Sequence, residues 1–240
     1  MTIDLKRALL FAKVSAIAYD DPSDKADAEL LALGLVKLAH FDHETSHAVL
    51  AHDGDGRLIL AHRGTMFSQA DIRNILVNLD LRKVSHFLGG KVPIGYYDAA
   101  CRVWAQAYSF ARARRLNRSR LVVTGHSMGG VDATLSGSIA YALGIYPEVW
   151  TYGAPKPGDA DFCAAIGGMN LTRIVRKRDF APTHSLVGDF AQPGEAQWLH
   201  AGTVTAVRER PGVNERIEDH WIEKYIADLE ALVDAAMVAA

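Results

Sequence analysis

A serine between two glycines has the spacing that nucleophilic chemistry requires. Residues 125–129 read Gly-His-Ser-Met-Gly, which fits the G-x-S-x-G pattern of a nucleophile elbow. In such an elbow, a sharp turn between a strand and a helix exposes the serine hydroxyl, and the glycines leave room for the crowded backbone. The helix that follows points its first N–H groups to where negative charge develops during acyl transfer. Ser127 is therefore the candidate nucleophile.

The neighbouring residues supply the elements that this turn needs. Residues 121–123 are Leu-Val-Val, an apolar and β-branched run typical of a buried strand. Residues 132–140 are rich in small side chains, which let a helix pack closely. The five-residue pattern alone would also fit an ordinary glycine-rich turn. The strand before it and the helix after it favour the catalytic interpretation.

The acid of a Ser-His-Asp triad should follow the nucleophile in this architecture, before the histidine. Asp179 comes just after the strand expected at residues 171–175, at the end of a strand where active-site loops gather. Asp159, Asp161 and Asp189 are the alternatives, but none of them directly follows a clear strand. Asp179 is the favoured acid.

Three histidines after the elbow could act as the base. His184 lies only a few residues beyond Asp179, which makes it an awkward partner on the same short loop, and His200 lies in a strand-like segment. His220 is at the start of the last expected helix, so its ring could point back to the top of the sheet. As base, it would accept the serine proton and return it to the leaving alcohol. His220 is favoured, and His200 stays as the alternative.

An acyl transferase or hydrolase of this kind also needs donors for the oxyanion. One donor is the backbone N–H of the residue after the nucleophile, here Met128, and the other comes from a second loop at a strand end. An apolar strand at residues 57–61 leads into His-Arg-Gly-Thr at residues 62–65. Thr65 is therefore the candidate for the second donor.

Residues 43–47, His-Glu-Thr-Ser-His, match the zinc-protease pattern H-E-x-x-H. That pattern binds zinc only on a helix, where both histidines share one face. Here strand-like residues follow, and Asp-Gly-Asp-Gly at residues 53–56 indicates a hairpin turn. A zinc peptidase using His43 and His47 is thus an alternative without its helix, and we expect no metal and no cofactor.

Composition narrows the remaining function classes. The chain has 240 residues, is 49% hydrophobic and has a formal net charge of -2, which gives no general case for binding nucleic acid or an anionic membrane. No apolar run is long enough for a transmembrane segment. Lys6 and Arg7 precede an apolar stretch, but its spacing favours an amphipathic helix over a signal peptide. A cytoplasmic location is favoured, with secretion as the alternative.

Strands that alternate with helices predict an α/β fold with a mostly parallel central sheet and helices on both faces. A second helix is expected from Asp24 toward Leu38, a long helix from Gly95 to Leu116, and a last helix from Ile217 onward. No linker or internal repeat divides the chain, so residues 1–240 are expected to form one domain. Residues 66–88 mix apolar and charged positions, as either a mobile helix over the site or a fixed surface helix would.

The combined motifs resemble the class 3 lipases, the fungal-lipase-like branch of the α/β-hydrolases. The matching segments lie in the same order along most of the chain: residues 61–65 (Ala-His-Arg-Gly-Thr), 72–79, 124–130, 151–155 (Thr-Tyr-Gly-Ala-Pro), 173–182 and 219–225. The resemblance implies an α/β-hydrolase fold and a lipase or esterase activity. It also implies Ser127, Asp179 and His220 as the triad and Thr65 and Met128 as oxyanion donors. It implies a lid within residues 66–90.

Two departures from the family pattern bear on the substrate. The family often has Trp where this chain has Ile75, and Val-His-x-Gly-Phe where residues 92–96 read Val-Pro-Ile-Gly-Tyr. Both lie outside the triad and concern the lid and the acyl site, so a long-chain triglyceride is not assumed. The expected partner is a small-molecule or lipid ester, with transient contact to a lipid interface. A non-catalytic α/β-hydrolase-fold binding protein is the alternative.

Overall fold

The computed structural model describes residues 3–43, 46–65, 82–183, 189–208 and 215–238. Its centre is an eight-stranded sheet in the order β1-β2-β3-β6-β7-β9-β11-β12. Neighbouring strands from β3 to β11 run parallel, and β1, β2 and β12 add antiparallel pairs at the two edges. The mostly parallel sheet predicted from the sequence is confirmed. The strands are β1 (Leu35–His43), β2 (Ser46–Asp53), β3 (Leu58–His62), β6 (Leu121–His126), β7 (Glu148–Tyr152), β9 (Asn170–Arg176), β11 (Ala196–His200) and β12 (Thr203–Val207).

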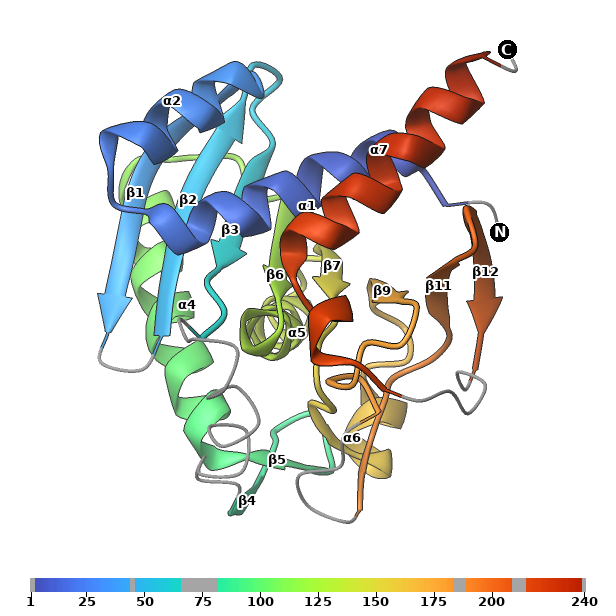
Figure 1. The fold of residues 1–240 in the computed structure, drawn as a ribbon. Coiled ribbons are helices and arrows are strands. Elements are labelled where there is room, and N and C mark those ends of the chain that lie inside the picture. The colour runs from blue at the N-terminus through green and yellow to red at the C-terminus, as the bar shows by residue number, and fades with distance from the viewer. Residues whose placement is uncertain (1–2, 44–45, 66–81, 184–188, 209–214, 239–240) are drawn as a thin grey trace.

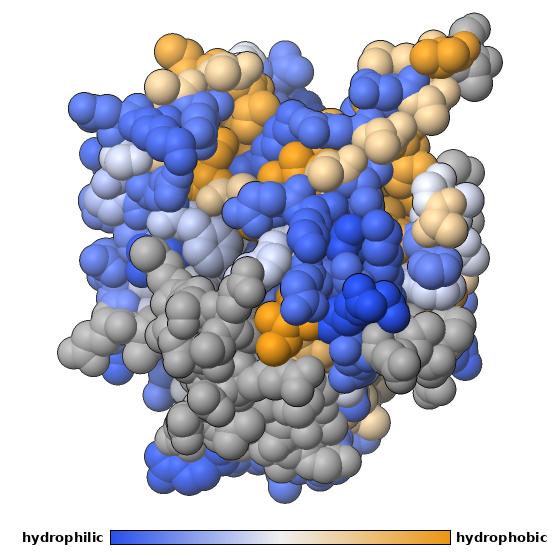
Figure 2. All heavy atoms as spheres, viewed as in Figure 1, coloured by the Kyte–Doolittle hydropathy of each residue, from blue (hydrophilic) through white to orange (hydrophobic). Residues whose placement is uncertain are grey.

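Helices cover both faces of this sheet (Figure 1). Helices α1 and α7 pack against each other on one face, and α4 and α5 pack together on the other. Figure 2 shows that the face with α1 and α7 is mostly hydrophilic with several scattered apolar patches, one of them at the end of α7. Met237 and Val238 are exposed at this end. The helices are α1 (Leu5–Asp20), α2 (Asp24–Ala32), α4 (Ile94–Ala113), α5 (Met128–Ala142), α6 (Ala160–Ala165), the short 3-10 helix η1 (Ile217–Asp219) and α7 (Ile222–Val238).

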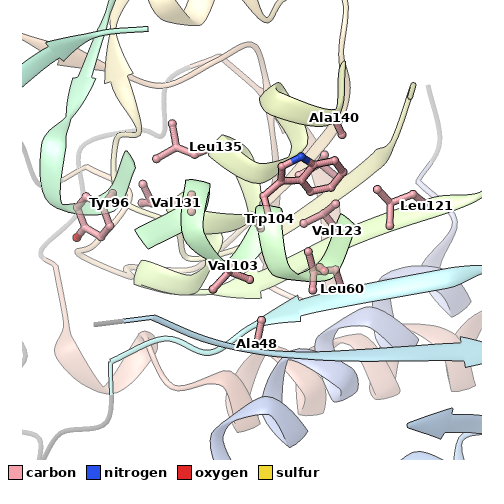
Figure 3. Close-up of a cluster of buried hydrophobic side chains, with 14 of the residues drawn as sticks. Ala48, Leu60, Tyr96, Val103, Trp104, Leu121, Val123, Val131, Leu135 and Ala140 are labelled. Carbon is pink, nitrogen blue, oxygen red and sulfur yellow. The ribbon is translucent and has the colours of Figure 1, made fainter. Parts of the chain in front are cut away.

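Each face of the sheet has its own apolar core, because side chains alternate along a strand. On β3, Ile59 packs toward α1 and α7, whereas Leu60 packs toward α4 and α5. Val122 and Val123 divide in the same way on β6. Figure 3 shows the α4–α5 core, with the Trp104 ring among side chains from the sheet and α5.

The second helix is shorter than the sequence pattern predicted. The helix begins at Asp24 as expected, with Ser23 capping its N-terminus by accepting the Ala26 N–H, but it ends at Ala32. Gly34 then adopts φ +74°, a left-handed conformation that commonly ends helices at glycine. The chain enters β1 at Leu35, so the residues toward Leu38 belong to a strand and not to the helix.

Two small sheets lie beside the main one, below its centre in Figure 1. They are β4 (Lys83–Ser85) with β5 (Lys91–Pro93), and β8 (Gly158–Asp159) with β10 (Phe190–Ala191). The expected lid spans residues 66–90, of which 66–81 lie outside the described residues; β4 and the turn to Gly90 form the described part. Within the described chain, no helix has both the length and the apolarity to cross a bilayer.

Candidate active site

Ser127 lies in a sharp turn between β6 and α5, as the sequence predicted. Its φ of 57° and ψ of -127° are unusual for a residue with a side chain and strain the backbone. A Cβ on Gly125 would lie 2.1 Å from the Gly129 carbonyl oxygen, and one on Gly129 would lie 2.4 Å from the His62 carbonyl oxygen. Both glycines are therefore needed for the turn to close against the neighbouring strand.

Three side chains from distant parts of the chain meet at this turn. The Ser127 Oγ lies 2.7 Å from His220 Nε2, and His220 Nδ1 lies 2.9 Å from each carboxylate oxygen of Asp179. Because a carboxylate only accepts, Nδ1 donates to Asp179 and Nε2 is left to accept the serine proton. Asp179 and His220 are fully buried and Ser127 is 2% exposed. The three predicted residues thus form one continuous hydrogen-bonded chain.

The Asp179 carboxylate has two further donors. The Tyr225 hydroxyl donates to Oδ2 at 2.6 Å, and the Ala181 N–H donates to Oδ1 at 2.9 Å. Burial, together with the charge of Asp179, raises the pKa of Tyr225 well above its ordinary value, so the phenol stays a donor. Gly153, at φ 57°, leaves the space for this group, since a Cβ there would lie 2.5 Å from Asp179 Oδ2 and 3.2 Å from His220 Nδ1.

A second histidine supports the backbone of the candidate base. His126 Nε2 donates to the His220 carbonyl oxygen at 2.6 Å, because a carbonyl can only accept. Its Nδ1 is then the acceptor for the Tyr19 hydroxyl of α1, at 2.8 Å. Burial and the nearby His220 hold the pKa of His126 well below its ordinary value, which keeps this ring neutral.

Sequence reasoning did not identify Tyr19, His126 or Tyr225 as parts of the site. Tyr19 lies in the first helix and Tyr225 in the last, so no local pattern connects either residue with the elbow. His126 lies within the elbow motif, but its hydrogen bonds to the His220 carbonyl oxygen and the Tyr19 hydroxyl depend on segments far away in the sequence. These groups come together only because α1 and α7 pack against each other on the same face of the sheet.

The described alternatives for acid and base have other contacts. His200, on β11, stacks on Trp198 with ring centroids 4.4 Å apart. Asp159 caps α6 by accepting the Phe162 N–H at 2.9 Å, and Asp189 forms an ion pair with Lys83. Asp161 is exposed in the first turn of α6. His184 lies outside the described residues.

The two candidate oxyanion donors lie at the same sheet edge as the elbow. Met128 is the first residue of α5, where backbone N–H groups have no partner within the helix. Thr65 follows β3, and its hydroxyl contacts the Met128 sulfur. Gly64 packs so closely against the Tyr19 hydroxyl, 2.0 Å from a Cβ built there, that no side chain fits. A Cβ on Gly64 would also lie 2.6 Å from the His126 carbonyl oxygen, so the loop that holds Thr65 packs directly against the elbow.

The two histidines of the H-E-x-x-H pattern lie on paired strands and not on a helix, while residues 44–45 lie outside the described residues. His43 ends β1 and His47 lies on β2, opposite Asp42. His47 Nδ1 is 3.2 Å from Asp42 Oδ1, and its Nε2 is 3.6 Å from Asp21 Oδ2. Across the described ranges, no group of three or more His, Cys, Asp or Glu side chains is arranged to hold a metal ion. His43 and His47 therefore lie on two antiparallel strands and do not share one helical face, which is the arrangement that a zinc protease uses.

Comparison with known protein families decides the family. The family model for class 3 lipases matches residues 59–188, which run from β3 through the elbow and past Asp179. This chain belongs to the class 3 lipase family. The resemblance seen in the sequence motifs is thereby confirmed.

Curated proteins that match the chain include fungal lipases. A lipase of Rhizopus niveus is 28% identical over 171 residues, which are 67% of this chain and 43% of that protein. A lipase of Rhizomucor miehei is 26% identical over 174 residues, which are 65% of this chain and 46% of that protein. The chain spans about half the length of the curated relatives it matches.

Solved structures share the fold. Lipase II from Rhizopus niveus superposes with a TM-score of 0.73 at 20% identity, covering 90% of this chain and 92% of that one. Lip2 lipase from Yarrowia lipolytica gives 0.71 at 16% identity, covering 91% and 89%. A triacylglycerol lipase whose catalytic centre is a serine protease triad gives 0.73 at 20% identity, covering 92% and 94%. The α/β-hydrolase fold expected for this class 3 lipase family member is confirmed.

Proposed function

We propose that this chain is a serine hydrolase that cleaves carboxylic esters through an acyl-enzyme on Ser127. The observation that carries the proposal is the hydrogen-bonded chain from Ser127 Oγ to His220 Nε2, at 2.7 Å, and from His220 Nδ1 to both oxygens of Asp179, at 2.9 Å. Distances in this range let the proton leave the hydroxyl as the oxygen attacks. Membership of the class 3 lipase family supports the same assignment.

The first half-reaction forms the acyl-enzyme. The Ser127 Oγ attacks the ester carbonyl carbon while His220 Nε2 takes its proton, and the carbonyl electrons move onto the oxygen. The backbone N–H groups of Met128 and Thr65 are the proposed donors to that oxyanion. When the intermediate collapses, the bond to the leaving oxygen breaks and His220 gives its proton to the departing alcohol. Asp179 fixes the ring and stabilises the imidazolium throughout.

The second half-reaction releases the acid. Water attacks the acyl carbon, His220 Nε2 takes a proton from that water, and the proton returns to the Ser127 Oγ as the acyl bond to the enzyme breaks. The product is a carboxylic acid and the free enzyme. Apart from the ester and the attacking water, each step uses only side chains and backbone groups of this chain. Membership of the class 3 lipase family supports a lipid ester as the substrate. Transient contact with a lipid interface is part of the proposal.

Hydrolysis of p-nitrophenyl esters of increasing acyl length tests the proposal. Wild type should release p-nitrophenol, and Ser127→Ala should abolish the activity. Ser136→Ala is the matched control, since Ser136 is a buried serine on the same helix, two turns from the elbow. The acyl length at which the rate peaks would separate a short-chain esterase from a lipase. Absence of Ser127-dependent hydrolysis at every length would contradict the proposal.

A chelator separates this proposal from the zinc peptidase alternative. Dialysis against EDTA should leave ester hydrolysis unchanged, because no proposed step needs His43 or His47. The double substitution of those two histidines to alanine should likewise leave the kcat for esters unchanged. Loss of activity with chelator and its recovery with zinc would favour the peptidase alternative instead.

A further inference from the structure

The candidate acid and base lie on two segments that must be held together. Asp179 follows β9, whereas His220 follows η1, 41 residues later in the chain. Between them, the Arg216 N–H donates to the Arg178 carbonyl oxygen at 2.8 Å, and Asp179 and Arg216 form an isolated parallel bridge. Backbone contacts thus connect the two segments a few residues before His220, but they do not reach His220 itself.

The side chain of Asp219 connects the two segments directly beside His220, because Asp219 is the residue before the candidate base. Its Oδ1 accepts the Arg176 Nη1 at 2.7 Å, and its Oδ2 accepts the backbone N–H of Arg178 at 3.2 Å. Arg176 ends β9 and Arg178 directly precedes Asp179. One carboxylate therefore connects the residue before the candidate base to the residue before the candidate acid.

Arg176 also binds a second carboxylate, farther along the chain in α7. Its Nε donates to Asp228 Oδ2 on α7 at 2.8 Å, while its backbone N–H donates to the Tyr225 hydroxyl at 3.1 Å. The guanidinium is 6% exposed, so these charge-assisted bonds form in a poorly hydrated place and are strong. Burial alone would raise the pKa of Asp219, but the hydrogen bond and charge of Arg176 outweigh it, and the pKa lies below its ordinary value.

The geometry separates two carboxylates with different tasks. Both Asp219 and Asp228 bind the same guanidinium, and both lie on the last part of the chain. Asp228 connects the middle of α7 to the sheet, two turns beyond the site. Only Asp219 is covalently next to His220, and only Asp219 also binds the backbone before Asp179. A small shift in the base can cost a large factor in rate, since its distance from the serine must stay near 3 Å.

We propose that Asp219 is a positioning residue that holds His220 against Asp179, and that Arg176 fixes Asp219 in this role. The expected effect on kcat rests on the proposed ester hydrolysis. The expected effect on the hydrogen bond between Asp179 and His220 does not depend on that function. Asp219 does not touch the reacting atoms and acts only through the segment that ends at His220. Arginine suits this position because a single planar guanidinium serves two carboxylates, which a lysine ammonium cannot do in the same geometry.

Kinetics of a matched pair of variants test the proposal. Asp219→Asn should lower kcat by about 10- to 100-fold with KM changed by less than about twofold, because the ester still binds but meets a misplaced base. Asp228→Asn removes a similar ion pair from the same guanidinium and should keep kcat within about twofold of wild type. Arg176→Lys should fall between them. If Asp228→Asn lowers kcat as much as Asp219→Asn does, or if neither does, the proposal is wrong.

Nuclear magnetic resonance supplies a readout that needs no turnover. The proton between His220 Nδ1 and Asp179 should give a resonance far downfield of the other imidazole protons in wild type and in Ser127→Ala. It should broaden or shift in Asp219→Asn and persist in Asp228→Asn. An unchanged resonance in Asp219→Asn would overturn the proposal even if esters are not the substrate. A different outcome would contradict only the proposed function. In that outcome, wild type and every variant that keeps Ser127 fail to hydrolyse esters, while the resonance is present in wild type and Asp228→Asn and changed in Asp219→Asn.

Folding of the variants is checked independently. The ion pair between Lys13 and Glu230, at 2.7 Å, joins α1 to α7 away from the site, so Glu230→Gln controls for loss of an ion pair on α7. This exposed pair contributes little, and its removal should change neither kcat nor the resonance. Should Asp219→Asn fail to fold, Arg176→Lys provides the same test from the other side. A folded Arg176→Lys variant with wild-type kcat and an unchanged resonance would refute the role of Arg176.

Discussion

Gly153 shows how a single missing side chain shapes the candidate site. It lies at the end of β7, faces the Asp179–His220 pair and has a left-handed φ of 57°. Its place was visible in the sequence only as part of the Tyr-Gly-Ala-Pro segment at residues 152–155. Glycine is required here for two reasons. The backbone has a left-handed conformation, and a Cβ would clash with the Asp179 carboxylate, 2.5 Å from Oδ2.

Substituting Gly153 separates these two reasons. Gly153→Ala should lower kcat at least about tenfold, because the methyl group displaces the carboxylate from His220. Gly144→Ala is the matched control, since Gly144 has a similar φ of 73° with nothing within 4 Å of a Cβ. Both changes should cost about 1 kcal/mol in unfolding free energy for the strained backbone. Urea denaturation and ester kinetics measure the two effects, and a Gly153→Ala enzyme with normal kcat would contradict this account.

At the same scale, sequence reasoning identified some site residues and not others for a physical reason. Ser127 and Asp179 each follow an apolar strand, so their position at the sheet edge can be predicted from local pattern and chain order. His220 was favoured by its place before the last helix. Tyr19 carries no such signal, and Asp219 is visible only as the first residue of the family-like segment 219–225. Their contacts with the site form only when the first and last parts of the chain pack on the sheet.

The β4–β5 hairpin depends on a buried neutral histidine. His86 is 4% exposed, and its Nδ1 accepts the Leu88 N–H at 3.2 Å. The Ser138 hydroxyl donates to the Leu135 carbonyl oxygen at 2.6 Å, so His86 Nε2 is the donor to Ser138 Oγ at 3.1 Å. Both ring nitrogens are thus used by the neutral form. Burial lowers the pKa of His86 to about 4.

This histidine predicts acid sensitivity of the fold. The folded pKa of about 4 lies below the unfolded value of 6.5, so the unfolded chain binds more protons between these limits. The contribution of neutral His86 to the free energy of unfolding is therefore fully present above pH 6.5, and it is lost as the pH falls toward 4. His62, whose pKa burial lowers to about 3, acts in the same direction. His86→Gln should therefore reduce, without abolishing, the fall in melting temperature between pH 7 and pH 4.5. An unchanged fall in the variant would exclude His86 as a source.

Long elements were predictable from the sequence, and their ends and the shortest strands were not. The first and last helices follow from apolar residues at helical spacing, which the structure confirms in α1 and α7. The sequence pattern predicts too long a second helix, because apolar residues continue at Leu33 and Leu35. In the structure, Gly34 adopts a left-handed conformation just after the helix ends. Strands of two residues, such as β8 and β10, have no pattern long enough to detect.

The central sheet lies between two layers of helices and forms an apolar core with each of them. Ile59 and Leu60 are adjacent on β3, and both are almost fully buried, yet they belong to opposite cores. If residues 1–240 form one domain, as the sequence predicts, the two layers should unfold together. A division into separately folding parts would instead give each core its own transition.

Substitutions at these neighbours test that proposal. Ile59→Ala and Leu60→Ala should each cost about 2–5 kcal/mol of unfolding free energy, the usual range for removing a buried aliphatic side chain. Both should shift one common, cooperative transition, followed by calorimetry and by tryptophan fluorescence. Trp104 lies in the α4–α5 core and Trp150 in the α1–α7 core, so comparison with Trp104→Phe and Trp150→Phe variants assigns part of the fluorescence change to each layer. Separate transitions for the two probes would contradict a single domain.

The most direct test of the whole account is whether Ser127 alone reacts with a fluorophosphonate. In that reaction the serine oxygen bonds to phosphorus, fluoride leaves, and His220 accepts the proton. Mass spectrometry of the intact protein should show one adduct, mapped to the peptide that contains Ser127. Ser127→Ala should give none, and His220→Ala should react far more slowly. No adduct on wild type, or an adduct at another residue, would contradict an activated nucleophile at the elbow.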